Sequence, residues 1–184
     1  MRSVTDLCNV ALSHLAQGYV VNDMEENSPQ ARLCNTFYPV ARQELLDDKH
    51  QWTFALNRVA LNQSLDVMPL VAYGLPSDMI RPFQLASELP FHIEGAHLIT
   101  GDLAPVLIYV RDMKELALMP AKFKTALSYR LAALIAGALT QDANKTNQMM
   151  QMFALSRQEA VSEDLQQHQI KQIPDFVGSF IGAR

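Results

Sequence analysis

The first predicted helix is marked by apolar residues that recur every three or four positions over the first 15 residues, the spacing of one helix face. Ser3 and Asp6 resemble a capping box, in which each side chain bonds the backbone amide of the other residue. We therefore expect a helix over residues 3–16, with Gly18 closing it in a left-handed conformation.

A second helix is predicted after an exposed polar loop at residues 22–27. Ser28 is a favourable helix cap, and Pro29 suits the first turn, where a backbone N–H has no partner within the helix. Apolar residues continue at helical spacing, so we expect this helix to end near residues 48–50.

The pattern changes after Trp52, where prolines become so frequent that long helices are excluded. Glu94-Gly95 stands between two apolar runs and predicts a tight hairpin. We expect residues 52–111 to form a small β-rich insertion. The runs of strand length are residues 53–61, 91–93, 97–100 and 106–110.

Helical spacing returns beyond Pro120 in two long stretches. The first is rich in alanine, which permits close helix packing, and the second runs over residues 142–169. Met149 and Met150 lie in the second stretch. Methionine repacks readily against varied partners, so both are candidate subunit-interface residues, with an ordinary helix–helix core contact as the alternative.

The end of the chain combines a proline and two glycines with many large apolar side chains. Such a segment is costly to leave in water, so we expect it to dock on a partner. The candidate docking residues are Ile170, Ile173, Phe176, Val177, Phe180 and Ile181.

These patterns together predict an α+β fold. We expect a helical bundle of about four helices, a β-sandwich-like or β-hairpin insertion between helix 2 and helix 3, and an extended C-terminal tail. The predicted units are the N-terminal helix pair (1–51), the β-rich insertion (52–111), the C-terminal helices (112–169) and the docking tail (170–184).

The composition of the 184-residue chain narrows the classes of function. Charged residues make up 18%, against about 25% in typical soluble domains, so we expect copies of the chain to cover part of its apolar surface. A net charge of -4 without a basic stretch argues against sequence-specific nucleic-acid binding. The longest strongly apolar stretch, residues 131–139, is far shorter than the roughly 20 residues of a membrane span, so we expect a soluble protein made in the cytoplasm.

Residues that could carry chemistry are few. The sequence has no phosphate-loop, nucleophile-elbow or common zinc motif. His92 and His97 flank the predicted hairpin turn but lack a third defined metal ligand. Cys8 and Cys34 lie in apolar helical patterns, which favours core packing over a disulfide. We therefore predict that the chain is not an enzyme and holds neither cofactor nor metal.

Asp78 and Arg81 lie in a proline-flanked loop of the predicted insertion. Their opposite charges can form a weak local ion pair or bridge neighbouring subunits. We keep both alternatives and treat the two residues as candidates for the subunit interface.

Several segments resemble, in their order along the chain, the head-to-tail adaptor (connector) proteins of tailed bacteriophages, particularly the tail tubular protein A-like family of short-tailed phages. Each segment is weakly specific alone, and the resemblance comes from the ordered series, which spans most of the chain. After an N-terminal helix pair, the segments are Trp52-Thr53-Phe54, Tyr73-Gly74-Leu75-Pro76-Ser77-Asp78 with Arg81, Ile93-Glu94-Gly95 with Leu98, Val106-Leu107-Ile108-Tyr109-Val110, and Met119-Pro120-Ala121-Lys122-Phe123.

The resemblance implies a helical bundle with a β-sandwich-like insertion, assembled into a homo-oligomeric ring of about twelve copies in the neck of the virion. The implied role is structural: the ring lies between the portal and the tail, and genomic double-stranded DNA passes through it without specific binding. The implied partners are the portal protein and a downstream tail or nozzle protein, and no membrane. In related adaptors a C-terminal segment or a long helix reaches the portal, which corresponds here to residues 170–184.

Two other interpretations remain. A tail completion or tail terminator protein would also form rings, but with sixfold symmetry and a body dominated by strands, which the long predicted helices disfavour. A small ligand-binding module would use the β-rich insertion as its site. Its sign would be a pocket with convergent polar groups and acids of shifted pKa.

Overall fold

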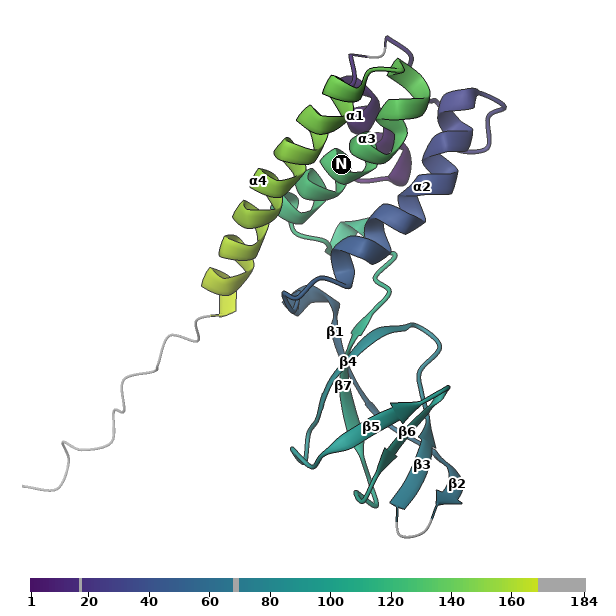
Figure 1. The fold of residues 1–184 in the computed structure, drawn as a ribbon, viewed down its shortest axis with the longest axis vertical. Coiled ribbons are helices and arrows are strands. Elements are labelled where there is room, and N and C mark those ends of the chain that lie inside the picture. Colours follow the sequence, from purple (N-terminus) through teal and green to yellow (C-terminus); the bar gives the residue numbers. More distant parts are fainter. Residues whose placement is uncertain (17, 68–69, 169–184) are drawn as a thin grey trace, which may run out of the picture.

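Four helices and seven strands form the part of the chain that the computed structural model describes, residues 1–16, 18–67 and 70–168. The helices make a bundle, and the strands make a separate β-domain (residues 56–111) at one end of it, so the molecule is elongated (Figure 1). The α+β prediction is confirmed, with two small antiparallel sheets inserted between helix 2 and helix 3.

Helix α1 (Val4–His14) begins as the sequence predicts. The Ser3 side chain accepts a hydrogen bond from the Asp6 amide, and the Asp6 carboxylate accepts one from the Ser3 amide, which completes the capping box. The end of the helix differs from the prediction, because the left-handed residue is Ala16, at φ 56°, instead of Gly18. Leu15 is buried, and the chain turns directly after it.

Helix α2 (Pro29–Leu46) is capped by Ser28, whose side chain accepts a hydrogen bond from the Ala31 amide at 3.1 Å. The helix ends before residues 48–50, where the sequence placed its end. The tertiary structure explains the earlier end. Trp52 is buried in the bundle core, and its indole Nε1 donates to the carbonyl oxygen of Leu45 at 2.7 Å, so the chain must turn between them.

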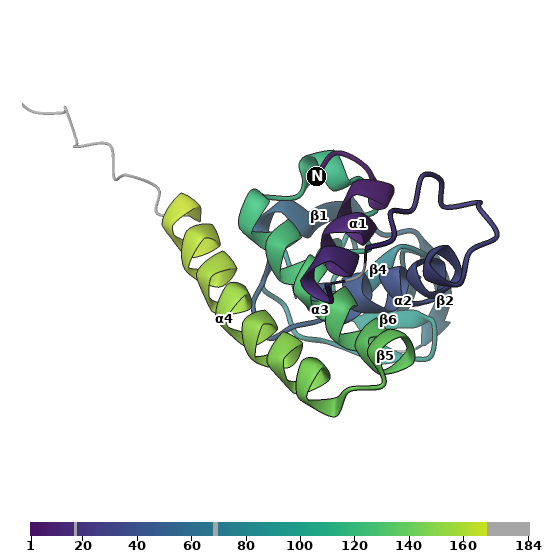
Figure 2. The ribbon, with the colours of Figure 1, turned by 90° about the horizontal axis from the view of Figure 1, so that it is seen from above.

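Helix α3 (Ala121–Thr140) is the central helix of the bundle, with contacts to α1, α2 and helix α4 (Ala143–His168). Figure 2 shows α4 along the outside of the bundle. Four of the six alanines of α3 are buried, which lets its neighbours approach closely. One face of α4 packs on α3, and its remaining faces are exposed.

The β-domain consists of two antiparallel sheets that share a small core. One sheet has the strand order β1-β7-β4 and the other the order β2-β3-β6-β5. Both contribute to the core residues Tyr73, Leu85, Leu98, Leu107 and Tyr109. The strands are β1 (Leu56–Ala60), β2 (Gln63–Val67), β3 (Leu70–Gly74), β4 (Met79–Leu85), β5 (Phe91–Glu94), β6 (His97–Thr100) and β7 (Val106–Arg111).

The sequence predicted β5, β6 and β7 well but missed three strands, β2, β3 and β4. β4 contains Pro82, and proline is disfavoured inside a strand because it has no N–H to donate. β4 is at the edge of its sheet, with register shifts on both sides of this proline, so the missing N–H is tolerated. The predicted hairpin is present, but its turn is one residue later. Glu94 pairs with His97, and Gly95 has φ +58°.

Candidate interaction surfaces

A buried ion pair anchors the segment that follows the β-domain to the bundle. Two chain crossings, residues 47–55 and 112–115, connect these parts. Arg42 on α2 donates from Nε and Nη2 to the two carboxylate oxygens of Asp112, each at 2.9 Å. The two side chains are only 7% and 13% exposed. A bidentate pair this deep fixes orientation, because separating its members would leave a charge away from water.

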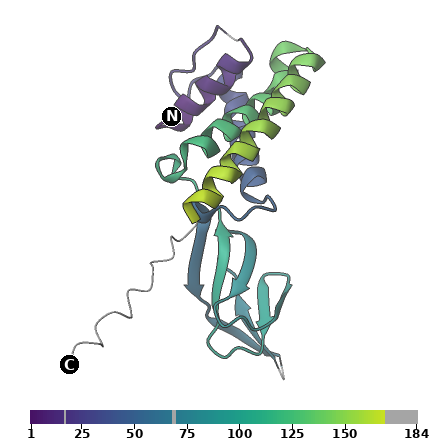
Figure 3. The same ribbon diagram turned by 90° about the vertical axis from the view of Figure 1, so that its left-hand side faces the viewer.

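A second polar cluster connects α4 to the first crossing. Asp164 is 3% exposed and accepts a hydrogen bond from the Thr53 hydroxyl at 2.7 Å. The same carboxylate lies 2.7 Å from Nε2 of His50. Nearer the start of α4, Arg157 forms an ion pair with Asp48. Figure 3 shows this end of α4 beside the place where the bundle meets the β-domain.

These contacts were not found by sequence reasoning, because their members are far apart in the chain. In the sequence these residues are isolated charged positions, and no local pattern marks them as partners. The polar contacts attach the two crossings to the bundle, and the buried Trp52 of the first crossing adds an apolar contact. Its ring lies edge-on to Phe123, with centroids 4.9 Å apart. Both connecting segments are therefore anchored to the bundle by polar contacts.

Asp78, a predicted interface residue, is engaged within its own chain. Its carboxylate accepts a hydrogen bond from the hydroxyl of Tyr109 at 3.0 Å. Its carbonyl oxygen accepts from the amide of Asp112 at 2.7 Å. The residue thereby braces the start of β4 against the second crossing.

Arg81, the other charged candidate, does not pair with Asp78, so the predicted local ion pair is not formed. It points toward the first crossing instead: Nη2 donates to the carbonyl oxygen of His50 at 3.5 Å, and Nε lies 3.9 Å from Asp47. Nε is buried and has no hydrogen-bond partner among the described residues. The subunit-bridging role of both residues stays a prediction.

The two candidate methionines of α4 differ in position. Met149 is 4% exposed and packs in the bundle core, so it offers almost no surface to a neighbouring subunit. This position agrees with the alternative, a helix–helix core contact, because a helix that packs along one face buries only some of its neighbouring positions. Met150 is 42% exposed, and its sulfur accepts from Arg130 at 3.1 Å. It remains a candidate.

The predicted docking tail lies outside the described residues. Ile170, Ile173, Phe176, Val177, Phe180 and Ile181 are therefore not placed by the structure. Helix α4 ends at His168, the last described residue before this segment.

The other candidates for chemistry are dispersed. Cys8 and Cys34 are free and fully buried, as core residues are, and a hydrogen bond between the thiols together with burial raises the pKa of Cys8. His92 bonds Glu94 at 3.0 Å, whereas His97 lies 3.2 Å from the Ser64 hydroxyl. Among the described residues, no three His, Cys, Asp or Glu side chains gather so that they could hold a metal ion.

The β-domain carries a pocket of about 390 Å³ with mainly apolar walls. The acids whose pKa is lowered, Asp6, Glu26 and Asp102, are not among its lining residues. Each is held in its charged form by hydrogen bonds within a helix cap or a loop. Acids of shifted pKa, the expected sign of a ligand-binding module, are therefore not part of the lining of this pocket.

Within the described part of the chain, no helix is both long enough and apolar enough to cross a membrane. In comparisons with models of known protein families and with curated proteins, no match to this chain was found.

Proposed function

We propose that this chain is a structural subunit of the head-to-tail adaptor ring of a bacteriophage, lying between the portal and the tail and lining the channel through which DNA leaves the head. The observation that carries the proposal is the order of elements. A two-sheet β-domain is inserted between the second and third helices of a four-helix bundle, which is the architecture that the resemblance implies.

The rigid junction supports this role. A ring that transmits force between two parts of a particle needs subunits that keep their shape. The Arg42–Asp112 pair and the Asp164 cluster anchor to the bundle the two connecting segments that lead to the β-domain. The net charge of -4 also suits a channel through which DNA slides, because a strongly basic wall would hold the phosphates.

Portal docking is assigned to residues 170–184, through their large apolar side chains. Deleting residues 171–184 should leave the fold and the melting temperature of the remaining chain unchanged and abolish assembly on the portal. Circular dichroism and co-sedimentation with the portal protein measure the two effects. Normal portal binding by the truncated protein would refute this assignment.

The central test is the mass of the purified protein, alone and mixed with the portal protein of the same phage, by native mass spectrometry. We expect rings of about twelve copies with the portal bound. Rings of six copies would favour the tail completion or terminator alternative. A monomer that does not bind the portal protein would contradict both. It would favour the ligand-binding module, with the apolar pocket as its site.

A further inference from the structure

Two cysteine side chains meet in the core of the bundle. Cys8 on α1 and Cys34 on α2 are free cysteines, and both are fully buried. Their thiols share a hydrogen bond, so the two sulfur atoms are neighbours. The sequence pattern favoured core packing for each residue, but it could not show that the two thiols face each other. The proposed function makes no use of this pair.

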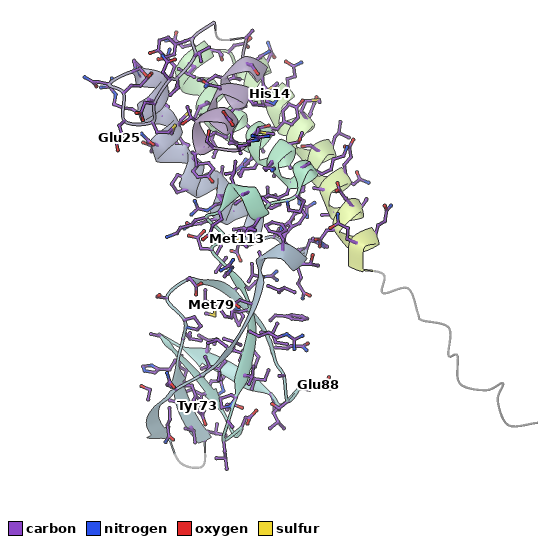
Figure 4. The ribbon with its side chains drawn as sticks, turned by 180° about the vertical axis from the view of Figure 1, so that it is seen from behind. His14, Glu25, Tyr73, Met79, Glu88 and Met113 are labelled. Carbon is purple, nitrogen blue, oxygen red and sulfur yellow. The ribbon has the colours of Figure 1, made fainter. Side chains whose placement is uncertain are left out.

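Helices α1 and α2, which carry the two cysteines, are otherwise only slightly in contact. Each packs mainly on α3. Figure 4 shows His14 at the end of α1 and Glu25 on the loop that leads to α2, both in the bundle. Helix α1 has 11 residues, and an isolated helix shorter than about 12–15 residues is marginal in water. Its position therefore depends on tertiary contacts, of which the thiol pair is one.

The loop between the two helices holds the cysteines in register. Asn9, the residue after the first cysteine, donates from Nδ2 to the carbonyl oxygen of Val21 and accepts from the Val21 amide, both at 2.8 Å. Asn35, the residue after the second cysteine, donates from Nδ2 to the carbonyl oxygen of Met24 at 2.6 Å. The neighbours of both cysteines are thus fastened to one loop, which keeps the thiols together without a covalent bond.

The hydrogen bond between the thiols makes them chemically different. The S–H group of Cys8 donates to the sulfur of Cys34, which lowers the pKa of Cys34. The same bond, together with burial, raises the pKa of Cys8. The thiolate is the reactive form of cysteine, so Cys34 is the nucleophile of the pair. Cys8 is the neighbouring thiol that can complete a disulfide.

We propose that Cys8 and Cys34 form a redox-responsive pair, which closes to a disulfide in the presence of a hydroperoxide and locks α1 to α2. The Cys34 thiolate attacks one peroxide oxygen, the O–O bond breaks, and hydroxide leaves as a sulfenic acid forms. The Cys8 sulfur then attacks the Cys34 sulfur, the S–O bond breaks, and the Cys8 proton leaves with the hydroxide as water. In total, two thiols and one hydrogen peroxide give one disulfide and two waters.

A small oxidant suits this buried pair. Hydrogen peroxide is uncharged and little larger than water, so a local opening of α1 is enough to admit it. A bacterial cytoplasm keeps thiols reduced, whereas a particle outside the cell meets oxidising surroundings. The disulfide would therefore form in the finished particle. This timing rests on the proposed function, whereas the formation of the disulfide does not.

The first test treats the purified protein with hydrogen peroxide below its melting temperature and then unfolds it in an alkylating reagent. Peptide mapping by mass spectrometry should find Cys8 joined to Cys34 in the treated protein, and both alkylated in the untreated protein. The disulfide closes residues 8–34 into a loop, so the melting temperature should rise by roughly 6–12 °C. A reductant should reverse the rise.

Cys34→Ala is the matched control. Each protein is compared with itself before and after treatment, so any cost of the substitution to folding cancels. Treated Cys34→Ala should show no rise in melting temperature. Hydrogen exchange gives a second measurement: the amides of α1 should exchange roughly 10-fold more slowly in the treated unmodified protein than in the untreated one, because the disulfide suppresses local opening. Treatment of the variant should leave this rate unchanged.

Two free thiols after treatment would overturn the inference, as would sulfinic acid at Cys34 without a disulfide, or disulfides only between different chains. A Cys8–Cys34 disulfide that leaves the melting temperature and the exchange of α1 unchanged would overturn the locking of α1. Each of these results leaves the adaptor proposal standing, because none of them measures assembly. A monomer that does not bind the portal protein would reject the adaptor proposal and leave the disulfide result intact.

Discussion

The Arg42–Asp112 pair provides the strongest test of how the two parts of the molecule are joined. Replacing Asp112 by alanine would leave the Arg42 guanidinium, which is 7% exposed, without its carboxylate partner. Removing one member of a buried ion pair costs about 3–5 kcal/mol. Asp112 is 13% exposed and its removal admits some water, so we expect the lower end, about 3 kcal/mol of unfolding free energy.

Urea denaturation followed by circular dichroism measures this loss. With a slope of about 2 kcal/mol per molar urea, the midpoint should fall by about 1.5 M. The matched control is Glu159→Ala, which removes an ion pair to Lys122 whose side chains are 50% and 61% exposed. That pair is screened by water, so its loss should lie within the error of the measurement.

A double-mutant cycle separates the pair from its surroundings. Replacing Arg42 alone by leucine should also destabilise the protein strongly, because it leaves the Asp112 carboxylate without its partner. The double variant Arg42→Leu/Asp112→Ala should lose much less than the sum of the single losses. If Asp112→Ala is no more harmful than Glu159→Ala, or if the two single losses simply add, the pair does not hold the junction as argued here.

Three further predictions concern local features. Glu26 should titrate at a pKa of about 2, because hydrogen bonds from Ser28, Tyr19 and the Asn22 amide stabilise its charged form. Its contribution to stability is complete above the unfolded pKa of about 4.3 and is lost as the pH falls toward 2. An NMR titration midpoint near 4 would contradict this prediction. Ser28→Ala should lower the unfolding free energy by about 1 kcal/mol through loss of the α2 cap, and Ser28→Gly by clearly less, as thermal melting can show. Trp52→Phe should lower the unfolding free energy by about 1–3 kcal/mol, because the Leu45 carbonyl oxygen loses its indole donor. An unchanged urea midpoint, followed by circular dichroism, would argue against that hydrogen bond.

The local elements followed from the sequence because their causes are local. Ser3 and Asp6 cap a helix through neighbouring amides, and Ser28-Pro29 starts one by the same chemistry. The frequent prolines after Trp52 exclude long helices wherever the chain goes. The α+β class and the place of the β insertion between helices 2 and 3 could therefore be predicted from pattern alone.

The strands were predicted less completely, because a strand depends on partners elsewhere in the chain. Pro82 is compatible with β4 only since that strand lies at the edge of its sheet, a position that no local pattern reveals. The hairpin turn shifted by one residue for a similar reason. The register that pairs Glu94 with His97 is set by the whole of β5 and β6.

The candidate surfaces depended most on the tertiary structure. The sequence by itself determined which residues are charged or apolar, and so which of them could take part in a contact. Only the fold decided that Met149 is buried while Met150 is exposed, that Arg81 turns toward His50, and that Asp112 reaches Arg42. The physical reason is that burial and ion pairing are set by segments distant in the chain, and their arrangement in space is fixed only when the bundle and the β-domain have packed together.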